Sequence, residues 1–150
     1  MRQGNSEDVE ILPRVRGDAG VTFSPPGIQS AGIEWVIDAR GCDPSCLTDV
    51  GILKSLFDEL VADLALTTVG EDRWHVFPGT GGITGLRLLS ESHLTVHTFP
   101  EHGSLCLNLF CCRPHSDWTF SERLRALAGA QEISVRKIER HYAAMRPALA

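Results

Sequence analysis

The sequence predicts an α+β fold, a two-layer sandwich in which helices cover one face of a mostly antiparallel sheet. One observation is a segment whose apolar residues recur at a clear helical period. A second is a group of short segments rich in β-forming residues and separated by brief turns. The third is their order, which is strand, helix, several strands, helix and strand. Regular alternation of strands and helices would instead favour a parallel sheet.

The expected strands are rich in β-branched and aromatic residues and are bounded by Gly, Pro and Ser. They cover residues 32–39, 73–77, 83–89, 92–98, 104–112 and 132–142. The first helix follows the first strand, and Thr48 or Asp49 can cap its start. Its apolar stripe comprises Leu53, Leu56, Phe57, Leu60, Val61 and Leu64. A shorter helix is expected over residues 117–128.

The length of 150 residues fits one ordinary domain. Residues 1–31 carry Gly, Pro and Ser without a sustained period, so we expect a flexible N-terminal tail there. The compact domain is then expected over residues 32–150. The loop PGTGG, residues 78–82, lacks the ending and the following helix of a phosphate-binding loop, and therefore predicts a tight turn.

The net charge of −5 disfavours nucleic acid and anionic membranes as partners, because both select basic surfaces. No apolar run is long enough to span a bilayer, and the polar N-terminus lacks the apolar centre of a secretory signal. We therefore expect a cytoplasmic protein. In that compartment the five cysteines, an odd number, are expected to be mostly free thiols.

Reactive side chains gather in residues 88–112, within strands that should build a core. They are Ser90, Ser92, His93, His97, His102 and Cys112. The simplest interpretation is a half-exposed sheet with hydrogen-bonded histidines. A metal site is the second, because strand alternation places His93 and His97 on one face, and Cys42 and Cys46 can add ligands. The sequence contains no CxxC pair, which weakens that interpretation.

The third interpretation is nucleophilic chemistry by Ser92. A serine can attack the carbonyl that precedes it, which replaces the amide with an ester. Loss of the serine α-proton then eliminates the ester, and hydrolysis leaves a pyruvoyl group at a new N-terminus. The reaction needs a strained Glu91–Ser92 bond, a donor that polarises the carbonyl and a nearby proton acceptor. His97 and Thr84 are the candidates for the last two.

The segment ESHLTVHTFPEHG, residues 91–103, is followed by Cys112, twenty residues after Ser92. This arrangement resembles the bacterial S-adenosylmethionine decarboxylase proenzymes, whose pattern contains Glu-Ser-His, then His-Thr-Trp/Phe-Pro-Glu, then a strand ending in Phe-x-Cys. Upstream, GGITG resembles the Gly-Val-Ser-Gly of the family, and GCDPSCLTD resembles its early turn and helix start. The resemblance runs from about residue 32 to residue 142.

The resemblance implies that the chain cuts itself between Glu91 and Ser92. Ser92 then becomes the pyruvoyl group and forms a Schiff base with the substrate amine, so that neither pyridoxal phosphate nor a metal is used. His97 stands at the position of the family's processing histidine, and Thr84 at that of a serine that supports the same step. Cys112 matches the family's catalytic acid, and an ordinary thiol, with a pKa of about 8.5, can hold and donate a proton at neutral pH.

The resemblance also implies a substrate site. Phe77 and Phe99 match aromatic positions that sandwich the adenine, and Glu101 matches the carboxylate that binds the ribose hydroxyls. Core packing is the alternative interpretation of both phenylalanines. Two departures from the pattern flank the strand that ends in Cys112: Asn108 stands where many relatives have Asp, and Arg113 where they commonly have Gly.

Three functions follow as hypotheses. The resemblance implies a decarboxylase of the small molecule S-adenosylmethionine, which supplies the aminopropyl donor for spermidine synthesis and acts as a homodimer of processed protomers. Asn108 and Arg113 motivate an alternative, a pyruvoyl-dependent decarboxylase of a basic amino acid such as ornithine or arginine. The third is a non-enzymatic relative that binds a ligand or a partner. The intact residues Glu91, Ser92, His97 and Cys112 argue against the third.

Overall fold

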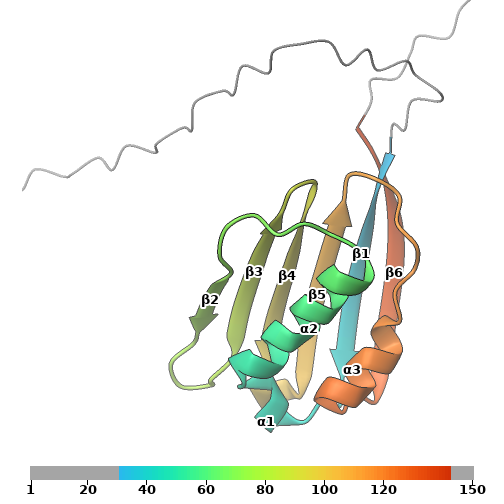
Figure 1. Ribbon diagram of the computed structural model, residues 1–150. Coiled ribbons are helices and arrows are strands. Elements are labelled where there is room, and N and C mark those ends of the chain that lie inside the picture. The colour runs from blue at the N-terminus through green and yellow to red at the C-terminus, as the bar shows by residue number, and fades with distance from the viewer. Residues whose placement is uncertain (1–30, 143–150) are drawn as a thin grey trace, which may run out of the picture.

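Six antiparallel strands form one sheet in the order β2-β3-β4-β5-β1-β6 (Figure 1). The strands are β1 (Ala31–Arg40), β2 (Arg73–Val76), β3 (Ile83–Leu89), β4 (Ser92–Phe99), β5 (Ser104–Cys111) and β6 (Glu132–His141). The computed structural model describes residues 31–142. The tail expected over residues 1–31 therefore lies, except for its last residue, outside the described residues. The fold confirms the predicted α+β class.

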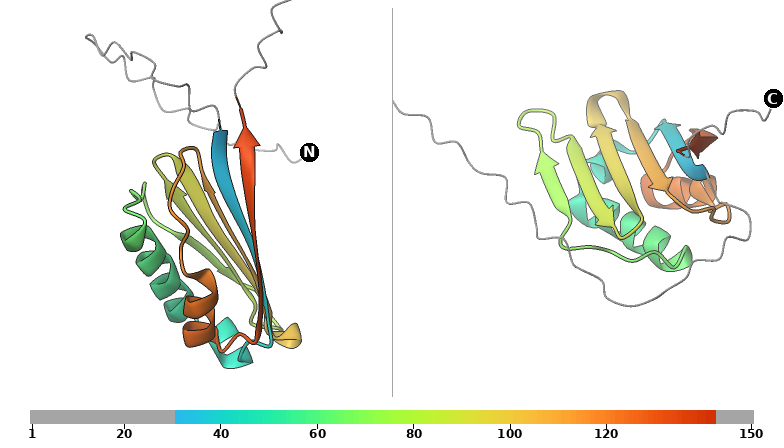
Figure 2. Two further views of the ribbon diagram at one scale, coloured as in Figure 1. Left: turned by 90° about the vertical axis from the view of Figure 1, so that its right-hand side faces the viewer. Right: turned by 90° about the horizontal axis from the view of Figure 1, so that it is seen from above.

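The helices all lie on one face of the sheet, as the edge-on view in Figure 2 shows. They are α1 (Pro44–Leu47), α2 (Val50–Asp63) and α3 (Phe120–Ala128), with a short 3-10 turn η1 (Pro100–His102) between β4 and β5. Asp49 caps α2, its carboxylate accepting from the backbone N–H of Gly51 at 2.7 Å. Of the described helices, none is long and apolar enough to cross a membrane.

Two helical segments differ from the sequence prediction. The turn expected after β1 contains the one-turn helix α1, whose start is capped by Asp43. A four-residue helix is too short to show an apolar period. The last helix begins at Phe120 instead of residue 117, because the side chains of the preceding residues contact other elements of the structure. Trp118 donates from its indole N–H to Asp63 at 2.8 Å, and Asp117 pairs with Lys137.

The core fills the space between the helices and the sheet. The apolar stripe of α2 supplies it as predicted, and the inward residues of β1, β4 and β5 complete it. Its largest fully buried side chains include Trp35, Ile37, Leu53, Leu56, Phe57, Leu60, Ile83, Leu94, Leu107 and Leu109. Gly85 fits beneath the ring of Trp74, where an added Cβ would lie 2.1 Å from a ring carbon. This close approach lets Trp74 reach Phe57, with ring centroids 5.1 Å apart.

The face of the sheet without helices, which we call the open face, carries a mixture of polar and apolar side chains. Leu86, Leu88 and Ile138 are among its exposed apolar residues. They alternate along their strands with residues that face the helices, such as the buried Arg87. Exposed apolar side chains on a sheet face of this kind are typical of a surface that is covered by a partner.

Candidate functional site

Ser92 is the first residue of β4 and follows a two-residue turn, Ser90 and Glu91, that joins it to β3. Leu89 and Ser92 pair across this turn, so the bond between Glu91 and Ser92 lies at the tip of a hairpin. The only described non-glycine residue with a positive φ is Ala65, so neither turn residue is left-handed. Strain in the Glu91–Ser92 bond therefore stays a prediction.

The carbonyl oxygen of Glu91 accepts a hydrogen bond of 3.0 Å from the backbone N–H of Cys112. This carbonyl belongs to the bond that precedes Ser92, and a donor on its oxygen stabilises the negative charge that forms when a nucleophile attacks. The donor expected from the sequence was a side chain, His97 or Thr84, whereas a backbone N–H leaves no signal in a sequence. The side chain of Glu91 is also held, because Arg113 Nη2 lies 2.7 Å from Glu91 Oε1.

A cavity of about 220 Å³ adjoins this turn. We call the cavity and its lining residues the turn site. The lining residues are Ala65, Leu66, Thr67, Ser90, Glu91, Ser92, Cys111, Cys112, Arg113 and His115. The site therefore brings Ser92 and Cys112 together, as expected from the sequence, and it also includes the segment that follows α2. A hydrogen bond of 2.9 Å, from the N–H of Ser90 to the carbonyl of Thr67, holds this segment against the turn.

The end of α2 shapes one wall of the turn site. The N–H of Leu66 bonds to the carbonyl of Val61 at 2.9 Å, and that of Ala65 to Ala62 at 3.1 Å. This pair of bonds is the Schellman arrangement that ends many helices, with Ala65 in the left-handed position that glycine usually fills. Its φ of 51° costs an alanine energy that a glycine does not lose.

Cys111 and Ser92 are register partners in the β4–β5 pair, so their side chains lie on the same face. Burial raises the pKa of the Cys111 thiol to about 11, although a hydrogen bond with the Ser92 side chain acts in the opposite direction. Cys111 is therefore protonated at neutral pH. It is buried, as expected, while Cys112 is half-buried.

The second group of predicted residues lies together on the open face. Thr84 and His97 are register partners, and the hydroxyl oxygen of Thr84 lies 2.6 Å from Nδ1 of His97. The ring of His97 also contacts Phe77 and Phe99, with centroids 5.3 and 4.5 Å away. We call these four residues the aromatic cluster. Glu101 follows in η1 and is exposed.

The turn site and the aromatic cluster are at opposite ends of β4. Ser92 and His97 are five residues apart on the strand, which corresponds to about 17 Å. An odd separation also places their side chains on opposite faces. Within one chain, His97 and Thr84 therefore do not reach Ser92, although the three are close in sequence.

Asn108 lies between these two groups on the open face, at a register position opposite Thr95. Its amide donates to Glu34 Oε1 at 2.6 Å, and Glu34 also pairs with Arg140. A neutral amide can make this bond to a carboxylate, whereas an aspartate would repel it. An asparagine at this position is therefore compatible with the neighbouring Glu34.

The metal interpretation finds no support in the described part of the chain. No group of three or more candidate ligands lies together among residues 31–142. His93 does lie on the open face, where its ring packs on Phe110 with centroids 5.5 Å apart. Burial raises the pKa of the Cys42 thiol, which disfavours the thiolate that a metal requires.

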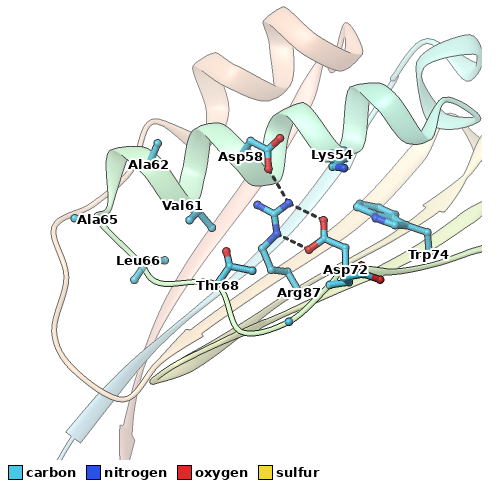
Figure 3. Close-up of a pocket in the computed structure, with 12 residues that line it drawn as sticks. Lys54, Asp58, Val61, Ala62, Ala65, Leu66, Thr68, Asp72, Trp74 and Arg87 are labelled. Carbon is cyan, nitrogen blue, oxygen red and sulfur yellow. Dashed lines mark hydrogen bonds and ion pairs between the residues drawn. The ribbon is translucent and has the colours of Figure 1, made fainter.

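A larger cavity, about 710 Å³, lies elsewhere, between α2 and the edge of the sheet (Figure 3). Arg87 occupies its floor and donates from Nε and Nη2 to the two oxygens of Asp72, both at 2.6 Å. Nη2 also pairs with Asp58 of α2 at 2.7 Å. Since the arginine pairs with carboxylates of both segments, we interpret it as a bridge that fixes the loop before β2 to the helix.

Comparisons with known proteins bear on the family of the chain. The family model described as S-adenosylmethionine decarboxylase matches residues 33–141. An S-adenosylmethionine decarboxylase proenzyme of Geobacillus kaustophilus is 35% identical over 124 residues, which cover 80% of this chain and 93% of that protein. One of Symbiobacterium thermophilum is 34% identical, covering 73% and 82%.

Other relatives match over a shorter stretch. For the proenzyme of Pyrobaculum islandicum, 35% identical over 79 residues, the chain spans 61% of the relative's length. The crystal structure of the adenosylmethionine decarboxylase from Aquifex aeolicus superposes with a TM-score of 0.62 over 80% of this chain and 98% of that one. At 22% identity this likeness shows the fold alone. From the family model and the Geobacillus relative, we conclude that the chain belongs to the S-adenosylmethionine decarboxylase family.

Proposed function

We propose that the chain cuts itself between Glu91 and Ser92 and then decarboxylates S-adenosylmethionine with the pyruvoyl group that Ser92 becomes. The observation that carries the proposal is the hydrogen bond from the N–H of Cys112 to the carbonyl oxygen of Glu91. The decarboxylated product is the aminopropyl donor for spermidine synthesis. Proenzymes of this activity are the relatives with which the chain shares its family.

The cut begins when Ser92 Oγ attacks the carbonyl carbon of Glu91. The carbon–nitrogen bond then breaks, which gives an ester between the two residues. A base takes the α-proton of Ser92, the Cβ–O bond breaks, and Glu91 leaves as a carboxylate. Water replaces the nitrogen, which departs as ammonia. During the attack, the N–H of Cys112 supports the charge on the Glu91 oxygen.

The turn site fits the pyruvoyl group. Ser92 is half-buried at the end of the sheet and adjoins a cavity of about 220 Å³. The group supplies a carbonyl that binds the substrate amine and accepts the electrons released when carbon dioxide leaves. Cys112 also lines this cavity, and its Sγ is the atom from which we expect a proton to return to the substrate carbon. Cys111 helps to fix the Ser92 side chain from the neighbouring strand.

The aromatic cluster supports the choice of substrate. Phe77 is 37% exposed and lies on the same face as Phe99 and His97, so its ring is available for stacking on a flat base. Aromatic faces also attract cations such as a sulfonium. Glu101 is exposed beside this cluster, where its carboxylate can accept from ribose hydroxyls.

A homodimer can bring the aromatic cluster of one protomer to the end of the sheet that carries Ser92 in the other. A two-fold axis that runs across the strands, between two open faces, reverses the strand direction of the second copy. His97 and Thr84 of that copy then approach the end of the first sheet that carries Ser92. The exposed apolar residues of the open face, such as Leu86 and Leu88, support burial of this surface. We therefore propose that each complete site combines the turn site of one protomer with the aromatic cluster of its partner.

The decisive measurement is the intact mass of the purified protein. We expect two fragments, residues 1–91 and 92–150, whose summed mass equals that of the uncut chain plus one water minus one ammonia. A carbonyl reagent should label the second fragment, and Ser92→Ala protein should remain whole and unlabelled. An uncut wild-type chain would contradict the proposal.

Substrate choice is tested with carboxyl-labelled compounds scored by released carbon dioxide. We expect release from S-adenosylmethionine and none from ornithine or arginine. If the cut protein releases carbon dioxide from ornithine or arginine alone, the pyruvoyl chemistry is supported and S-adenosylmethionine is ruled out as the substrate.

A further inference from the structure

Three consecutive residues of the β5 end contact the two residues of the proposed cut. The Cys111 side chain interacts with that of Ser92, and the N–H of Cys112 donates to the carbonyl of Glu91. Arg113 then reaches the Glu91 side chain, with 2.7 Å between Nη2 and Oε1. Glu91 is thus held at two points, its carbonyl by the backbone of one residue and its carboxylate by the side chain of the next.

We propose that Arg113 is a positioning residue for self-cleavage. Its guanidinium holds the Glu91 side chain, and this contact keeps the Glu91 carbonyl on the N–H of Cys112 while Ser92 attacks. The inference rests on the proposed function, and it assigns a task to a residue outside the matched motif.

The geometry of the hairpin makes this contact consequential. The turn contains only Ser90 and Glu91, so a rotation of Glu91 moves its carbonyl directly. Without the ion pair, a single hydrogen bond of 3.0 Å from the N–H of Cys112 would align that carbonyl. The ion pair closes a second connection between the same two chain segments, and two connections restrict rotation more than one. Reactions that depend on orientation are sensitive to such restriction.

The positive charge of Arg113 also favours the cut. Negative charge develops on the Glu91 carbonyl oxygen during the attack, and a carboxylate forms there when the ester is eliminated. Arg113 and His115 are the basic side chains that line the turn site, and an arginine is charged at any working pH. Since both members of the ion pair are exposed, by 63% for Arg113 and 44% for Glu91, water screens the effect. We expect a moderate change in rate and no loss of the fold.

The test follows the cut in time during cell-free synthesis of the full chain. After synthesis is stopped, the uncut fraction is measured by intact mass. Arg113→Ala should slow the cut about two- to fivefold, the range expected of one exposed ion pair. Arg113→Lys should recover most of the rate because it keeps the charge. Lys137→Ala is the matched control, since it removes an exposed pair with Asp117 and neither residue lines the turn site.

Coupling to Glu91 separates positioning from a general structural role. In a Glu91→Gln background, which removes the carboxylate charge, Arg113→Ala should give no further slowing. In the uncut Ser92→Ala background, Arg113→Ala should shift the unfolding temperature no more than Lys137→Ala does. Equal rates for Arg113→Ala and wild type would overturn the inference, as would an undiminished effect in the Glu91→Gln background. A wild-type chain that is never cut would instead refute the proposed function itself.

Discussion

The hydroxyl oxygen of Thr84 lies 2.6 Å from Nδ1 of His97 on the open face, at the end of β4 that is remote from Ser92. When Nδ1–H donates to this hydroxyl, Nε2 carries the lone pair and can accept a proton. The hydrogen bond thus orients the ring of His97, which we propose acts as a base on Ser92 of a partner subunit. This relationship underlies the proposal that the partner subunit completes each site.

A complementation experiment tests that arrangement. Ser92→Ala protein and His97→Ala protein should each remain uncut when made alone, because one lacks the nucleophile and the other the base. When both are made together, the heterodimer places an intact His97 beside an intact Ser92. We expect the His97→Ala chain to be cut in the mixture, as measured by intact mass. The absence of any cut chain would refute a site shared between protomers.

Mutation of each of the two neighbouring cysteines should affect activity differently. Cys112→Ala keeps the backbone N–H that bonds to Glu91, so the chain should still be cut. Loss of the thiol should lower the rate of carbon dioxide release about a hundredfold or more. Cys111→Ala removes a buried thiol that is protonated at neutral pH and should retain far more activity. Equal losses of activity in the two variants would contradict the assignment of the proton donor to Cys112.

The bridge between Arg87 and Asp72 should be visible in the stability of the fold. The two side chains are 5% and 9% exposed, so removing one leaves a buried charge without its partner. Arg87→Ala should lower the free energy of unfolding by about 3 kcal/mol in urea titrations of the Ser92→Ala background. Arg136→Ala, which removes an exposed pair with Asp38, is the control and should change it by less than about 1 kcal/mol.

The same bridge predicts a dependence on pH. The Arg87 guanidinium holds the pKa of Asp72 below its usual range. The pair therefore contributes fully above the ordinary carboxylate pKa of about 4 and is lost as the pH falls through the lowered value. In the uncut Ser92→Ala background, the stability difference between the chain with Asp72 and the chain with Asp72→Asn should be constant from pH 7 to about pH 5 and shrink below that range. A difference that does not shrink in acid would contradict this origin.

Replacing the left-handed Ala65 with glycine should stabilise the fold. Ala65→Gly removes the steric cost of φ 51° at the end of α2, and we expect a gain of about 0.5–1 kcal/mol in the free energy of unfolding. Ala62→Gly, an exposed position inside the same helix, should instead lose about 1 kcal/mol. Both are measured by urea unfolding of the uncut Ser92→Ala chain. A loss at both positions would mean that the helix end does not behave as a Schellman motif.

The sequence was sufficient for most of the fold. The strand over residues 83–89 was predicted in full, and the apolar stripe of α2 faces the core as its period indicated. These features depend on local patterns. The helix α1 was missed because it is shorter than one apolar repeat, and the start of α3 was misplaced because Trp118 binds Asp63 across the structure.

The site was predictable as a set of residues and less so as an arrangement. Ser92, Cys112 and Glu91 do lie together, while His97 and Thr84 form a separate group at the other end of β4. The odd spacing between Ser92 and His97 was a signal that they face opposite ways. The donor from the Cys112 backbone and the reach of Arg113 depend on strand register, which no local pattern in this sequence specifies.

The strand order has a consequence for the cut protein. Strands β1, β2 and β3 precede the bond between Glu91 and Ser92, whereas β4, β5 and β6 follow it, and β1 lies between β5 and β6. The products of the proposed cut would therefore be interlocked halves of one sheet, joined by the β3–β4, β5–β1 and β1–β6 ladders. Neither half has a complete sheet of its own. If the chain is cut as we propose, it is expected to assemble first and be cut afterwards, and the finished protomer would be a non-covalent pair of polypeptides.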